Sequence, residues 1–287
     1  MIKFGPAGMD DYFKNKPLST AEFLTLIGRE GLNAFEYQCG RGVRTGKSAA
    51  EEIGKRAEDA GISLSIHAPY YINMASVEEE KRKNSIHYVL QSMKLARYMG
   101  AKRVTAHIGS CAKIDREEAM GLALTTLRET ICACDENGFG DIVLCPEFMG
   151  KGNQLGNMEE IIRMCKVDDR IIPCIDFGHY NARYTGVLAD YGKYREIFDR
   201  IENDLGYEKI KYMHVHFSRV EYTKAGEKAH RNYEDIEFGP DFEPFAEQVA
   251  KRGLEPTVIC ESKDDRVKDA LNFKKLCEQA TAKEMAD

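Results

Sequence analysis

"RIIPCIDFGH", residues 170–179, is an apolar run that ends in Asp176 and His179. The run has the composition of a buried β-strand, and turn-forming residues follow it. A carboxylate and an imidazole at the end of such a strand have two explanations. Both side chains serve well in turns, or both point at a metal ion. One stretch cannot decide between these explanations, so the rest of the chain has to show whether the pattern recurs.

The pattern of a short apolar run followed by a longer amphipathic stretch recurs along the whole chain. The strands predicted in this way are residues 2–8, 33–39, 63–70, 103–110, 141–148, 171–179, 210–218 and 255–262. Several of the helical stretches between them stop at a glycine, as at Gly31, Gly61 and Gly100. Eight such units in 287 residues predict an α/β fold, a single-domain (β/α)8 TIM barrel over residues 1–287. A doubly wound open sheet is the alternative, but no glycine-rich phosphate loop follows the first strand.

Composition narrows the class of protein. Charged residues make up 31% of the chain and hydrophobic residues 43%, which is ordinary for a globular protein. There is no apolar run of 18 residues and no basic-then-apolar leader, so no membrane partner or signal peptide is expected. The net charge of −6 argues against a basic nucleic-acid coat but not against a nucleic-acid enzyme that uses metal ions. The nine cysteines lie mostly in apolar segments, so we expect reduced thiols in a cytoplasmic protein. We also expect a monomer.

Histidine and carboxylate side chains gather where the predicted strands end, which in a barrel is the end that carries the chemistry. The residues are His67, His107, Glu147, Asp176, His179, His214, His216 and Glu261, with His230 in the long connection after the seventh strand. Burying so many ionisable groups together is costly unless something compensates their charge. Divalent metal ions do so, and imidazole with carboxylate suits zinc, with manganese or iron as alternatives. The set exceeds the four ligands of one zinc ion, so two or three ions are expected if Glu147 bridges, an arrangement that suits hydrolysis of phosphate esters.

Several short segments resemble, in order and spacing, the signature segments of the endonuclease IV family of apurinic/apyrimidinic endonucleases. They are "HAPYYINMAS", "HIGS", "CPEF…GKG…LG", "CIDFGH", "MHVHFS" and "ICES", and the resemblance runs from about residue 2 to residue 277. It implies a TIM barrel of the xylose-isomerase-like superfamily with a trinuclear zinc centre. It also implies base excision repair, in which damaged duplex DNA is the partner and its backbone is hydrolysed on the 5′ side of an abasic site.

The resemblance assigns a role to each of these residues. His67 and His107 would bind one zinc ion, and Glu147 would bridge it to a second. Asp176, His214 and Glu261 would complete the second site, with Glu147 and Glu261 as the catalytic carboxylates. His179 and His230 would hold a third ion. Tyr70 matches a family tyrosine at the DNA-binding surface.

The chain departs from the family pattern in two places. The family has an aspartate two residues before its loop histidine, whereas Lys228 stands two residues before His230. Lysine does not ligate a metal when protonated, so the third site is either weak or completed by Glu227. The seventh strand also carries His216, which points to the same side as His214 and is a further ligand or a phosphate contact.

The loop after the second predicted strand, "QCGRGVRTGK", offers positive charge. Arg41, Arg44 and Lys47 could meet a DNA backbone, or the segment could be a solvated glycine-rich loop.

Two other functions compete with DNA cleavage. A sugar isomerase or epimerase of the same superfamily would use one divalent metal ion, held at Glu147, Asp176, His214 and Glu261, and would leave the remaining histidines without a shared role. A barrel that binds nucleic acid or metal without catalysis is the third hypothesis. The number of metal ions per chain separates the first two, since the isomerase needs one and the nuclease two or three.

Overall fold

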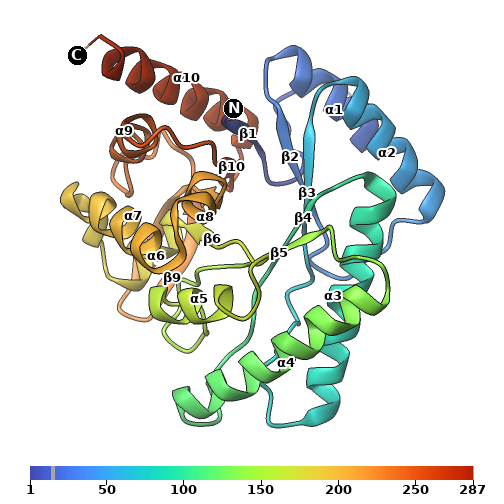
Figure 1. The fold of residues 1–287 in the computed structure, drawn as a ribbon. Coiled ribbons are helices and arrows are strands. Elements are labelled where there is room, and N and C mark those ends of the chain that lie inside the picture. The colour runs from blue at the N-terminus through green and yellow to red at the C-terminus, as the bar shows by residue number, and fades with distance from the viewer. Residues whose placement is uncertain (14–16, 287) are drawn as a thin grey trace.

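Eight short parallel strands form the centre of the computed structural model, which describes residues 1–13 and 17–286 (Figure 1). The strands are β1 Lys3–Pro6, β2 Ala34–Gln38, β3 Ser63–His67, β4 Arg103–Ala106, β5 Val143–Pro146, β6 Cys174–Asp176, β7 His214–Phe217 and β10 Thr257–Cys260. Each lies inside the range predicted from the sequence. The strands are shorter than predicted at one or both ends, and residues 210–211 of the seventh predicted strand belong to helix α8 Tyr207–Lys211 instead.

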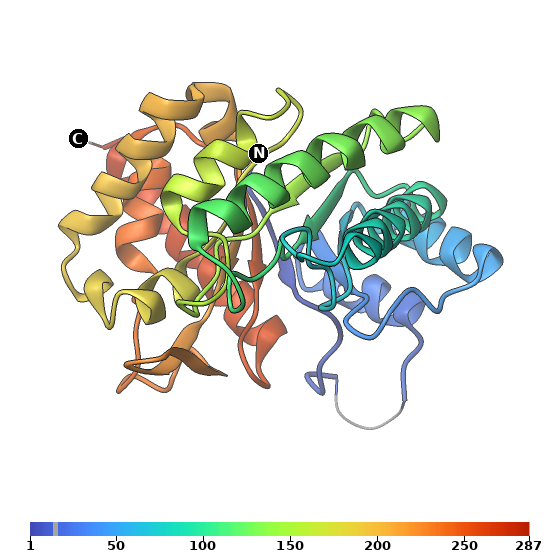
Figure 2. The ribbon, with the colours of Figure 1, turned by 90° about the horizontal axis from the view of Figure 1, so that it is seen from below.

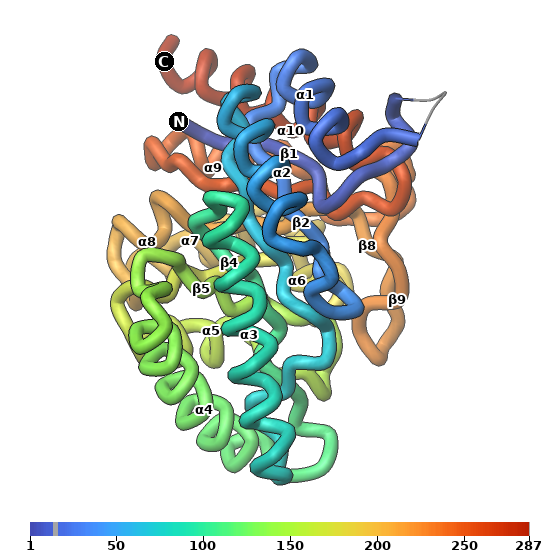
Figure 3. Tube along the Cα trace, turned by 90° about the vertical axis from the view of Figure 1, so that its right-hand side faces the viewer, coloured from blue at the N-terminus to red at the C-terminus, as the bar shows by residue number. Residues whose placement is uncertain are grey.

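Helices connect successive strands and surround the barrel. They are α1 Thr20–Arg29, α2 Lys47–Asp59, α3 Glu79–Met99, α4 Arg116–Glu136, α5 Met158–Cys165, α6 Phe177–Arg183, α7 Gly192–Leu205, α8 Tyr207–Lys211, α9 Glu243–Lys251 and α10 Arg266–Glu284, with the 3-10 turn η1 Val187–Ala189. Their starts follow local chemistry: Ser19 and Glu22 form a reciprocal capping box on α1. In Figure 3, α2, α3 and α4 run side by side along one flank. None of the helices in the described residues could cross a membrane.

The barrel closes as two half-barrels. One is the sheet β2-β3-β4-β5 and the other is the sheet β1-β10-β7-β6. Single parallel bridges join them, Ala7 to Glu36 on one side and Glu147 to Cys174 on the other. These bridges confirm the predicted α/β barrel, and they place two glutamates at the two seams.

The core fills the barrel and the space under the helices. A cluster of fully buried aromatic rings, Phe177, Phe217, Phe242, Phe245 and Phe273, packs between the second half-barrel and helices α9 and α10. All nine cysteines are free thiols and seven of them are buried, which agrees with their predicted use as small apolar residues.

The long connection after β7 folds into an antiparallel hairpin, β8 Arg219–Thr223 and β9 Gly226–Arg231. Figure 2 shows this hairpin, in orange, projecting below the barrel. Its pairing is irregular: Glu221 faces Ala229 while Tyr222 faces Glu227, so Lys228 is an extra residue on β9. Such a bulge changes which side chains of the strand share a face.

Candidate metal centre

Glu147 lies at the middle of the rim formed by the carboxyl ends of the strands. It follows β5 directly, and its side chain is buried. Its Oε2 atom is 3.1 Å from Nε2 of His67 and 3.2 Å from Nε2 of His107. His67 is the last residue of β3 and His107 follows β4, so the first predicted site is assembled from three successive strands of one half-barrel.

The other oxygen of Glu147 faces the second half-barrel. Oε1 lies 3.3 Å from Nδ1 of His179 and 3.5 Å from Nδ1 of His216. Nδ1 of His216 is also 3.6 Å from Glu261, which follows β10. Glu147, Asp176, His216 and Glu261 each offer a ligand atom, and these four atoms lie within 4.8 Å of one another. Glu147 therefore reaches two clusters, as expected of a bridging carboxylate.

The second cluster corrects one expectation. His214 was predicted beside Asp176 and Glu261, and the structure places His216 there instead. The register explains the difference: His216 pairs with Asp176 across β6 and β7, whereas His214 pairs with Cys174, one layer deeper in the barrel. His214 Nε2 lies 2.9 Å from the carboxylate of Glu36 rather than at the rim.

A third cluster consists of His179, His230 and Glu227. Glu227 takes the place of the aspartate that the family has two residues before its loop histidine. Nε2 of His179 is 3.3 Å from Oε2 of Glu227. The bulge at Lys228 is the reason, because the extra residue lets side chains three positions apart share a face of β9. Lys228 points elsewhere and forms an ion pair with Glu221.

A substitution pair tests this third cluster. Glu227→Ala is expected to lower the metal content by about one ion per chain, because two neutral imidazoles hold a divalent ion more weakly without a carboxylate. Lys228→Ala is the matched control and is expected to leave the metal content unchanged, since Lys228 pairs with Glu221 away from the cluster. Elemental analysis after dialysis measures both. Equal metal content in Glu227→Ala and the unaltered protein would remove Glu227 from the site.

The electrostatics of the centre fit a cation. Burial opposes ionisation of Glu147, but the imidazoles of His107 and His216 outweigh it and hold the pKa of that carboxyl well below its usual range. Burial also opposes protonation of His67, yet the hydrogen bond and charge of Glu147 raise the pKa of His67 to about 9. Burial raises the pKa of Asp176 to about 6. The acids thus need positive charge beside them, and a divalent ion supplies it without protonating the ligands.

Buried polar atoms without hydrogen bonds also favour a bound metal ion. Among the described residues, Oδ2 of Asp176 and Nδ1 of His216 are buried without a protein hydrogen bond. Oδ1 of Asp176 accepts from the backbone of His179 at the start of α6, which fixes the carboxylate. His67 Nδ1 lies 2.9 Å from the backbone oxygen of Ala68, and that contact directs Nε2 toward Glu147 at the rim. Buried polar atoms without partners are costly, and ligation of an ion would satisfy them.

The predicted DNA-binding residues lie beside this rim. Tyr70 is 58% exposed, and its ring centroid is 5.8 Å from that of His67 and 5.7 Å from that of His107. The loop after β2 packs against it so closely that a Cβ atom on Gly40 would fall 2.5 Å from the tyrosine ring. Arg41 and Arg44 on that loop are exposed. Lys47 begins α2 and contacts Glu51 and the Tyr98 ring, so it belongs to the helix rather than to the rim.

Glu36 is a residue of this region that sequence reasoning missed. It lies in the middle of β2 with its side chain fully buried, 2.9 Å from His214 and 3.0 Å from His216. A signal was present in the sequence: an acidic residue inside an otherwise apolar strand is rare in a barrel core without a partner.

The fold and the rim together are those of a barrel enzyme with a histidine and carboxylate centre. A model of the xylose isomerase-like TIM barrel family matches residues 24–283, and the chain belongs to this family.

Proteins similar in sequence differ in how much of the chain they match. A protein of Methanocaldococcus jannaschii, MJ0133, described as uncharacterized, is 32% identical over 266 residues, which are 91% of this chain and 92% of that protein. A probable endonuclease 4 of Mycoplasma pneumoniae is 29% identical over 159 residues, 54% of this chain and 52% of the endonuclease. The resemblance to endonuclease IV is therefore confirmed, although the match spans about half the length of that relative.

Solved structures share the fold. Endonuclease IV from Thermus thermophilus has a TM-score of 0.69 at 21% identity, covering 91% of this chain and 95% of the other. A D-tagatose 3-epimerase-like protein also has a TM-score of 0.69, at 19% identity and with 88% and 91% coverage. At these identities the likeness describes the barrel and does not choose between the two activities.

Proposed function

We propose that the protein is a metal-dependent phosphodiesterase that hydrolyses the DNA backbone 5′ to abasic sites. One observation carries the proposal: three adjoining clusters of histidine and carboxylate, two of which share Glu147, lie at the carboxyl ends of the strands. A single-ion enzyme needs one such cluster. Adjoining ions that share a carboxylate suit in-line displacement at phosphorus, because attacking and leaving oxygens are stabilised together.

The charge of the centre supports a phosphate substrate. The three clusters contain four carboxylates, those of Glu147, Asp176, Glu227 and Glu261. Three zinc ions would carry six positive charges against these four negative ones, which leaves a net charge of about +2. A protein with a net charge of −6 would thereby present a positive spot at the rim. That spot, with Arg41 and Arg44 beside it, would attract a phosphodiester.

The chain's own residues divide the remaining work. When bound, the ions would supply Lewis acidity toward the phosphate and a lower pKa for water. Glu147 would hold two sites at a fixed spacing through its two oxygens. The side chain of Glu261 is 15% exposed, more than that of either other carboxylate in its cluster, and it would orient the water. Tyr70 would place an aromatic face against the damaged strand.

The decisive assay uses a duplex with a single tetrahydrofuran abasic analogue. This analogue cannot undergo β-elimination, so a nick must come from hydrolysis. We expect cleavage on its 5′ side with a 3′-hydroxyl that a DNA polymerase extends, in protein loaded with zinc or manganese. No cleavage in protein that holds at least two ions per chain would overturn the proposal.

A change at Tyr70 separates DNA binding from metal binding. Tyr70→Ala is expected to weaken binding of abasic DNA by roughly 5-fold to 100-fold, since base stacking on an aromatic ring contributes about 1–3 kcal/mol. Zinc content should not change. Tyr212→Ala is the matched control, because Tyr212 is also exposed but precedes β7, at the opposite end of the barrel. Equal affinities of the two variants would contradict a role for Tyr70.

A sugar epimerase is the second candidate. The cluster of Glu147, Asp176, His216 and Glu261 would by itself hold one ion with two glutamates available for proton transfer. That function would leave the first and third clusters without a shared role. One ion per chain together with ketose turnover would favour the epimerase.

A further inference from the structure

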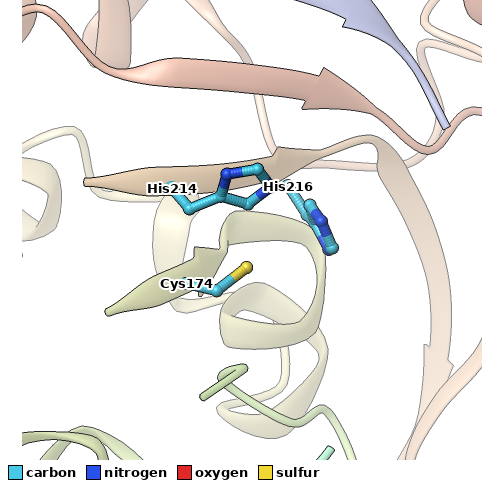
Figure 4. A group of neighbouring side chains, drawn as sticks. All are labelled: Cys174, His214 and His216. Carbon is cyan, nitrogen blue, oxygen red and sulfur yellow. The ribbon is translucent and has the colours of Figure 1, made fainter. Parts of the chain in front are cut away.

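Beneath the rim lies a second, wholly buried polar layer. Figure 4 shows part of it: His214 and His216 project from β7, and the sulfur of Cys174 on β6 points toward that strand. Glu36 on β2 completes the layer, and all four residues are fully buried. The rim uses His216, but the proposed function gives no role to the other three.

We propose that Glu36 is a positioning residue that holds the His216 ring so that Nδ1 faces the metal centre. The two nitrogens of His216 point to opposite neighbours. Nδ1 lies 3.5 Å from Glu147 and 3.6 Å from Glu261, whereas Nε2 lies 3.0 Å from Oε1 of Glu36. Nε2 is buried and makes no aligned hydrogen bond in the structure, but 3.0 Å is a hydrogen-bond distance, so a rotation of the ring would point its N–H at Oε1. A carboxylate that accepts from the second nitrogen of a ligating histidine fixes both its tautomer and its orientation.

Glu36 is itself firmly held. Its Oε2 atom accepts from the hydroxyls of Ser65 and Thr105, at 3.0 and 3.3 Å. Nε2 of His214 lies 2.9 Å from the same oxygen. Gln38 donates to Oε1 at 3.2 Å. The carboxylate therefore cannot follow a rotating imidazole, and the ring must turn toward the carboxylate.

The same residues allow another interpretation, a separate metal site. Cys174, His214 and His216 each offer a ligand atom, all within 4.8 Å of one another. One nitrogen of His216 cannot serve both this site and the rim. Nδ1 faces the rim and Nε2 faces Glu36. The oxygens of Glu36 are also occupied by hydroxyl, amide and imidazole groups. The geometry therefore favours a hydrogen-bonded layer, and a further ion becomes an outcome of the test.

The test is a zinc titration of the full chain against a chromophoric chelator. In Glu36→Gln, one zinc ion should bind about 10-fold to 100-fold more weakly, the usual effect of losing such a supporting contact. The other ions should bind as before. Cys174→Ser should leave every affinity unchanged, because serine keeps a polar atom beside His216 and leaves the Glu36 contact intact. Glu160→Gln controls for burying an amide in place of a carboxylate, since Glu160 is buried and paired with Arg116 on α4.

Two results would overturn the inference: unchanged zinc affinities in Glu36→Gln, or loss of an ion in Cys174→Ser. If Glu36→Gln does not fold, nitrogen NMR of the unaltered, zinc-loaded protein decides instead. The inference requires a proton on Nε2 of His216, and a proton on Nδ1 would overturn it. The inference rests on the proposed metal centre but not on the substrate. Protein that binds zinc as described and leaves abasic DNA intact would refute only the function, whereas protein that binds no zinc would refute both.

Discussion

Glu147→Gln is expected to lower the rate of abasic-site cleavage by at least about a thousandfold, a loss of about 4 kcal/mol in transition-state stabilisation. Glutamine keeps the shape of the side chain but has one oxygen, so it cannot serve two clusters. Its amide would also turn donor hydrogens toward ions that need electron pairs. We expect about one ion fewer per chain and little change in the far-ultraviolet circular dichroism.

Single-turnover kinetics and elemental analysis measure both effects. Glu160→Gln is again the matched control, because Glu160 is another buried glutamate that contacts no rim residue among the hydrogen bonds of the described chain. A Glu147→Gln protein with full activity would take Glu147 out of the mechanism.

Removal of the metal ions should cost stability as well as activity. A ligand held at about a thousand times its dissociation constant stabilises the folded state by about 4 kcal/mol, which corresponds to roughly 10 °C in Tm for a chain of this size. The physical reason is the buried charge, since carboxylates such as Glu147 and Asp176 lose their compensation. We therefore expect that prolonged chelation lowers Tm by at least this amount and that zinc restores it.

Differential scanning calorimetry with and without chelator measures this shift. Glu227→Ala should show a smaller shift than the unaltered protein, because it has one ion fewer to lose. An identical Tm before and after verified metal removal would show that the ions do not contribute to the fold.

The barrel could be predicted because its signal is periodic. Short apolar runs alternate with amphipathic stretches through the whole chain, and the polar residues at the strand ends mark one rim. The third cluster was harder. Lys228 occupies the position of an expected acid, and only the bulge on β9 shows that Glu227 replaces it. A one-residue bulge leaves no periodic trace in a short hairpin.

The register of β7 illustrates a second limit. His214 and His216 share a face of the strand, so alternation cannot tell which of them reaches the rim. That choice depends on how β7 is offset against β6, which pairs His216 with Asp176. Glu36 is hard to predict for a related reason. Apart from Gln38, its partners come from β3, β4 and β7, and no local sequence pattern indicates them.

Because the barrel is divided into two halves, the metal ions would also hold the two halves together. His67, His107 and Glu147 belong to one half, and Asp176, His216 and Glu261 to the other, while in the described residues each seam has a single bridge with few other backbone hydrogen bonds beside it. Ions bound by residues of both halves would cross-link the two sheets along a seam with few backbone hydrogen bonds. Amide hydrogen exchange should then respond to metal first at the seams. The amide of Phe148, which donates to Cys174 across one of them, is the place to look for opening that zinc suppresses.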